Sequence, residues 1–117
     1  MMKWATLGAI LLAVSLGGVV RAAETTAVTG SLIDTFCYTT MGAHGSSHAA
    51  CALRCVKKGA PVGLLEKGSH KLYVLLPARD ATALPDSVFN HMEQQVTITG
   101  NVLHSGGNTF LTVRSLK

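Results

Sequence analysis

Side chains that bind soft or borderline metal ions are concentrated in one short stretch of the chain. All three cysteines, two of the five histidines and one of the four methionines fall within residues 37–55. Thiolates, imidazoles and thioethers are ligands that copper, zinc and iron accept. We therefore take this stretch as the candidate site, whose potential donors are, in chain order, Cys37, Met41, His44, His48, Cys51 and Cys55.

The spacing of the last three donors predicts that they share one face of a helix. Residues 48–58 contain several good helix formers, finish with two lysines and are followed by Gly59, the usual order at a helix C-terminus. On this helix His48, Cys51 and Cys55 are spaced i, i+3 and i+7, so all three project from the same side.

The remaining donors precede this helix. Cys37 stands at the end of a predicted strand and His44 in the loop that follows, whereas Met41 is interpreted as a packing residue. The loop of about ten residues is too short to take the strand end far from the helix. The spacing matches no standard zinc finger, haem attachment or thioredoxin motif. The predicted metal ligands are Cys37, His44, His48, Cys51 and Cys55.

A disulfide that involves Cys37 is favoured over a site with all three cysteines as ligands, and it is compatible with a metal site built from the remaining cysteine, His44 and His48. One bridge would leave one thiol over, and a bridge would stabilise so small a domain by about 2–4 kcal/mol. Cys51 and Cys55 are poorly oriented to pair because residues four apart on a helix have nearly parallel Cβ vectors. If a bridge forms, we expect it to join Cys37 to one of these two.

Other chemistry has little support in the sequence. Serines occur near histidines, but no Gly-x-Ser-x-Gly nucleophile elbow is present. No Gly-rich phosphate motif follows a predicted strand. The sequence therefore predicts a protein that is not an enzyme.

The first 22 residues have the organisation of a secretory signal peptide. Lys3 precedes sixteen uncharged residues, 5–20, and small residues follow around Ala22. Cleavage after Ala22 would release a mature protein into the periplasm or the medium, where disulfides persist. A retained membrane anchor is the alternative, and no later segment could span a bilayer. We expect no membrane association after cleavage.

The remaining residues, 23–117, suffice for a single domain. This length excludes a dinucleotide-binding fold or a TIM barrel. The whole chain has a formal charge of +4, but without Lys3 and Arg21 it keeps 8 basic and 6 acidic residues. A net charge of about +2 is too small to indicate a nucleic-acid partner.

The elements that must position the site form a mainly β pattern with two short helices. Strands are predicted over 28–38, 61–65, 71–76, 95–103 and 109–116, and helices over 48–58 and 84–92. Five strands with a helix between the third and fourth match a small five-stranded OB-like barrel. An open α+β sheet is the alternative.

Two segments carry a resemblance to known proteins. Val-Thr-Ile-Thr-Gly-Asn-Val, residues 96–102, resembles the start of the closing hairpin in bacterial exported OB-like domains. The pattern Asp34-x-x-Cys37-Tyr38 … His48-x-x-Cys51-Ala52-x-x-Cys55 … Gly59-x-Pro61-Val62-Gly63 resembles small exported bacterial proteins of unassigned function. This resemblance implies a shared fold and site, and no activity.

The sequence thus favours a small exported metal-binding protein, with copper or zinc as the ion. A disulfide-stapled module that binds another envelope protein, without a metal or catalytic role, is the alternative. Oligonucleotide or oligosaccharide binding is less favoured because few aromatic side chains are present to stack against bases or sugars.

Overall fold

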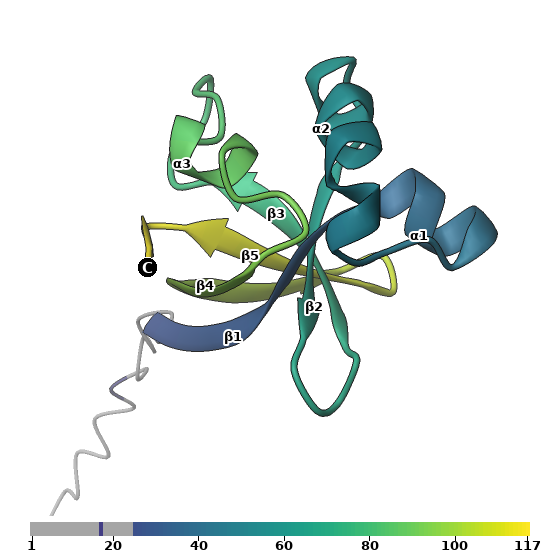
Figure 1. Ribbon diagram of the computed structural model, residues 1–117. Coiled ribbons are helices and arrows are strands. Elements are labelled where there is room, and N and C mark those ends of the chain that lie inside the picture. Colours follow the sequence, from purple (N-terminus) through teal and green to yellow (C-terminus); the bar gives the residue numbers. More distant parts are fainter. Residues whose placement is uncertain (1–16, 18–24) are drawn as a thin grey trace, which may run out of the picture.

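Five strands close into a small barrel in the computed structural model, which describes residue 17 and residues 25–117 (Figure 1). The order around the barrel is β1-β2-β3-β5-β4, and β1 also pairs with β4. The predicted five-stranded OB-like barrel is therefore confirmed, and the open sheet is not. The predicted signal peptide, residues 1–22, lies outside the described residues apart from Gly17. The strands are β1 (Thr25–Asp34), β2 (Val62–Glu66), β3 (Leu72–Pro77), β4 (Gln95–Ser105), β5 (Asn108–Val113) and a short β6 (Ser115–Leu116) beside β4.

Closure depends on β1, which is long enough to pair with two neighbours. Its first part pairs with β4 and its last part with β2, and Gly30 is opposite both Val96 and Glu66. A Cβ atom at Gly30 would overlap the carbonyl oxygen of Leu65. Glycine is therefore required where β1 crosses from one partner to the other. The parallel pairing of β3 with β5 completes the ring.

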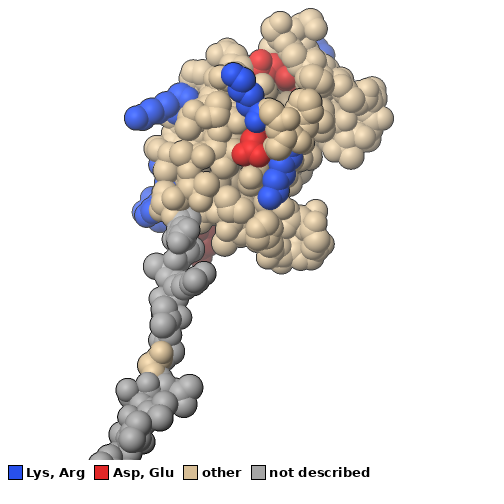
Figure 2. Space-filling view, turned by 90° about the horizontal axis from the view of Figure 1, so that it is seen from below, with Lys and Arg blue, Asp and Glu red and all other residues tan. Residues whose placement is uncertain are grey.

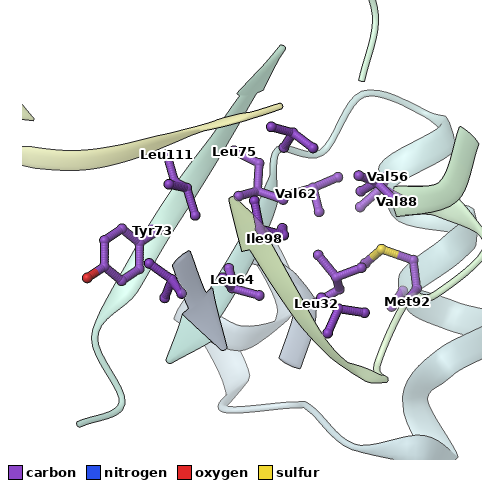
Figure 3. Packing of buried hydrophobic residues seen from close by; sticks show 14 residues of the cluster. Leu32, Val56, Val62, Leu64, Tyr73, Leu75, Val88, Met92, Ile98 and Leu111 are labelled. Atoms are coloured by element: carbon purple, nitrogen blue, oxygen red, sulfur yellow. The ribbon is translucent and has the colours of Figure 1, made fainter. Parts of the chain in front are cut away.

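The hydrophobic core fills the barrel and continues out of one end beneath the helices. Figure 3 shows Ile98 and Leu64 near the middle of this core and Val56 and Val88 at the end toward the helices. The alternation predicted for residues 96–102 is borne out at Val96 and Ile98, which are buried, while Val102 packs partly buried against the core.

The first helix replaces the predicted end of a strand. The sequence predicted a strand to residue 38 and a loop over 39–47, but β1 stops at Asp34 and α1 (Thr35–Met41) follows. The Asp34 carboxylate accepts the N–H groups of Phe36 and Cys37, so it caps the helix. Gly42, at φ 67°, ends it in the left-handed conformation. These caps outweigh the strand propensity of the aromatic and β-branched residues.

The predicted helix over 48–58 is present, and the one over 84–92 is shorter than expected. A 3₁₀ turn, η1 (Ser46–His48), leads into α2 (Ala49–Lys57). The later helix is confined to α3 (Asp86–Phe89). Within residues 25–117, three short α-helices and one 3₁₀ turn therefore stand where two helices were predicted. After α3 the chain continues through a turn to Glu93, which adopts φ 62° and donates its N–H to the Leu32 carbonyl just before β4 begins.

Charged side chains do not gather on the face of the molecule that Figure 2 shows. Lysine and arginine side chains stand apart there, with acidic and uncharged surface between them. Among the described residues, none of the helices has the length and apolar character needed to cross a membrane.

Candidate metal centre

The candidate donors lie in the connection between β1 and β2, which contains α1, η1 and α2. Figure 1 shows α1 and α2 near one another beside the upper end of β2. Asp34 at the end of β1 begins this connection, and the N–H of Thr35 donates to the carbonyl of Pro61 near its end. The two ends of the connection are thus held together.

Three sulfur atoms meet between the two helices. The Sγ atoms of Cys37 on α1 and of Cys51 and Cys55 on α2 all lie within 4.8 Å of one another. All three cysteines are free thiols, so the expected disulfide with Cys37 is not present. A tetrahedral ion with metal–sulfur bonds of about 2.3 Å holds its sulfurs about 3.8 Å apart, so small side-chain movements would suffice to bind one.

A second group of donors contains oxygen and nitrogen as well as sulfur. Ligand atoms of Asp34, Cys37 and His48 also lie within 4.8 Å of one another. Cys37 belongs to both groups, so the two form one continuous cluster. The structure therefore has a Cys/His/Asp cluster within metal-binding distance.

The orientation of the two cysteines on α2 follows from two buried residues beside them on the same helix. Ala52 and Val56 are buried in the barrel core, whereas Cys51 and Cys55, each one position earlier, are half-buried. A step of one residue turns about 100° around a helix. Packing of the Ala52–Val56 stripe against the barrel therefore directs the two cysteines toward α1.

Asp34 is the most deeply buried polar residue of the cluster. It is fully buried, and its Oδ1 atom accepts the capping hydrogen bonds of α1, at 2.9 Å from the nitrogen of Phe36. Burial alone would raise the pKa of Asp34, but interaction with the thiols of Cys37 and Cys55 and with the capping N–H groups lowers it below the ordinary value. The carboxylate therefore stays ionised beside the thiols.

The same carboxylate keeps the nearest thiols protonated in the metal-free protein. Interaction with Asp34, together with burial, raises the pKa of Cys37 to about 12. Burial and then Asp34 raise the pKa of Cys55 as well. A thiolate beside a carboxylate is unfavourable because two negative charges repel one another, and a cation between them would offset this.

Glu93, from a distant part of the chain, lies near His48 and Asp34 but belongs to neither donor group. It is 8% exposed, and its Oε2 atom accepts the N–H of Gly45 at 2.7 Å, which fixes the loop before η1. Burial raises the pKa of Glu93, and the Gly45 hydrogen bond and the charges of His48 and His44 oppose this. No spacing in the sequence indicates this residue, because its contacts are made 48 residues away.

His44 is exposed and lies outside both donor groups. Its ring packs edge-to-face with Tyr38, with the centroids 5.6 Å apart. Met41, interpreted from the sequence as a packing residue, is instead 67% exposed. The structure thus brings together Asp34, Cys37, His48, Cys51 and Cys55, and not His44.

No family model, curated protein or solved structure matches this chain.

Proposed function

We propose that this chain is a small exported transition-metal-binding protein that uses the cluster between α1 and α2. The observation that supports this most directly is the presence of three free thiols within 4.8 Å of one another. Sites with three thiolates bind Cu(I) or Zn(II), with an imidazole as a common fourth ligand. In this proposal Cys37, Cys51 and Cys55 hold the ion, with His48 as the adjacent imidazole.

The proposed role is binding and not catalysis. A Cys37 thiol with a pKa of about 12 is a poor nucleophile at neutral pH, since the thiolate is the reactive form. The signal-like first 22 residues support export, and a carrier or scavenger of metal in the periplasm would fit a protein of this size. N-terminal sequencing of the exported protein should give Ala23 as its first residue.

Metal affinity measured on anaerobically purified protein tests the proposal. We expect one or more tightly bound Zn(II) or Cu(I) ions by elemental analysis, and competition with a chromophoric chelator gives the affinity. Cys51→Ser and Cys55→Ser should each weaken binding at least about 100-fold, because each removes a ligand. His104→Ala, which alters an exposed histidine on β4, is the control and should change affinity less than about twofold. Equal affinity in all variants would reject the site.

The stapled binding module for another envelope protein remains the second proposal. Sulfur atoms within 4.8 Å of one another can also pair, and only one pair can form among three. A thiol count on protein taken directly from the periplasm separates the two functions. Three reactive thiols after chelation favour the metal site, whereas one thiol with a bridge to Cys37 favours the stapled module.

A further inference from the structure

Three buried oxygen and nitrogen atoms without hydrogen-bond partners lie in or near the group formed by Asp34, Cys37 and His48. Asp34 Oδ2, His48 Nε2 and Glu93 Oε1 are each buried and make no hydrogen bond within the described residues. An unpaired polar atom in the interior costs about 1–3 kcal/mol, so three in one region point to a ligand.

Both carboxylates accept backbone hydrogen bonds through one oxygen, and the other oxygen has no backbone donor. Asp34 uses Oδ1 to cap α1, and Glu93 uses Oε2 to accept the N–H of Gly45. Glu93 also adopts a left-handed backbone, with φ 62°, which costs of order 1–3 kcal/mol for a residue other than glycine. The backbone therefore fixes each carboxylate and leaves an oxygen for another contact.

The number of donors exceeds what one tetrahedral ion can use. Asp34, Cys37, His48, Cys51 and Cys55 offer five ligand atoms in two groups that share only Cys37. A structural zinc ion takes four. One ion that takes the three sulfurs and one further donor would still leave either Asp34 or His48 without a metal bond.

Formal charge leads to the same conclusion. With one divalent ion on three thiolates, the sulfur group carries a net charge of about −1, and the Asp34 carboxylate brings the cluster to about −2. Uncompensated charge in a buried site is costly. A second divalent ion would bring the total to about zero.

We propose that Asp34, Cys37 and His48, with Glu93 as the neighbouring carboxylate, form a second metal site. The Cys37 thiolate bridges this site to the three-sulfur site, so the protein holds a pair of ions. Carboxylate, imidazole and thiolate together suit zinc, and paired ions in proteins lie about 3.5–4 Å apart. This inference rests on the proposed function, since the bridging thiolate belongs to both sites.

Zinc titration of the reduced full-length protein under anaerobic conditions tests the pair. After gel filtration, elemental analysis should give two zinc ions per chain for the unaltered protein. Asp34→Asn and Glu93→Gln should each give one. Asparagine still caps a helix, and glutamine can still accept the Gly45 N–H, so both changes remove charge while keeping the backbone contacts. His104→Ala is the control and should give two.

Two cysteine variants test the bridge. Cys51→Ser should lose the ion on the three sulfurs and keep one, whereas Cys37→Ser should lose both. Circular dichroism of each metal-free variant checks the fold, and if Asp34→Asn does not fold, Glu93→Gln decides the question.

Each other outcome has a definite meaning. No zinc in the unaltered protein overturns both the proposed function and the pair. One zinc keeps the proposed function and overturns the pair. If both Asp34→Asn and Glu93→Gln still bind two zinc ions, the second ion lies elsewhere, and the proposed pair is also overturned.

Discussion

Asp34 joins the local structure of the site to its chemistry. Through Oδ1 it caps α1, which turns the chain so that Cys37 faces α2. Its charge also holds the Cys37 proton in place in the metal-free protein. One residue at the end of a strand therefore determines both where the Cys37 sulfur lies and how firmly it keeps its proton.

The effect of this charge can be tested through the reactivity of Cys37. Replacing Asp34 with asparagine removes the negative charge that disfavours the thiolate, so the pKa of Cys37 should fall from about 12 toward 9. Alkylation of Cys37 in metal-free, reduced protein, followed by mass spectrometry from pH 7 to 11, gives the profile. We expect the rate in Asp34→Asn to rise at lower pH than in the unaltered protein.

Asp34→Asn could also leave the reactivity of Cys37 unchanged. Superimposable pH profiles would show that burial, and not the carboxylate, controls this thiol. Phe36→Ser serves as the control, because Phe36 is exposed and next to Cys37 but contributes no charge.

At the scale of elements, the site depends on how two short helices are attached to the barrel. Neither α1 nor α2 is long enough to be stable alone. α2 is held through Ala52 and Val56, which are buried in the core, and α1 directly follows β1. The geometry of the sulfur group is therefore set by the barrel strands beneath it.

A close approach between β4 and β5 tests this dependence on the barrel. A Cβ atom at Gly100 would overlap the carbonyl oxygen of Thr112, and backbone cannot yield as a side chain can. Gly100→Ala should lower the free energy of unfolding by about 3 kcal/mol, measured by urea denaturation of the metal-free protein. Gln95→Ala, an exposed change in the same strand, should stay within about 0.5 kcal/mol. Equal stability of the two variants would contradict the close packing.

At the scale of the whole molecule, barrel closure brings distant parts of the chain to one place. Leu32 on β1 accepts the N–H of Glu93, and Glu93 in turn accepts the N–H of Gly45. The end of β1, the loop before η1 and the start of β4 are thus linked around the cluster. An ion bound there would join elements that separate when the protein unfolds.

Metal should therefore stabilise the entire domain. Ligand that binds only the folded state adds about 4 kcal/mol to the free energy of unfolding at 1,000 times its Kd. Thermal unfolding of reduced protein should shift upward with added zinc and return on chelation. Cys37→Ser, which removes the thiol shared by both donor groups, should lose most of this shift while His104→Ala keeps it. An unchanged melting temperature in the unaltered protein would contradict the linkage.

Much of the barrel was predictable from local patterns. Apolar and polar residues alternate over 95–103, and a turn and a last strand follow. This order predicted the β4–β5 hairpin, which the structure has. The i, i+3, i+7 spacing placed His48, Cys51 and Cys55 on one helix face for a reason that is also local, the helix period. The occurrence of all three cysteines within residues 37–55 was enough to indicate the region of the candidate site.

Tertiary structure decided the rest of the site. Sequence patterns predicted Cys37 at a strand end and His44 among the ligands, but capping by Asp34 placed Cys37 on α1, and the loop left His44 exposed. The position of Glu93 depends on barrel closure and on hydrogen bonds across long stretches of chain. Local propensity determines which segments become strands and helices, whereas burial and long-range pairing determine which charged side chains meet the thiols.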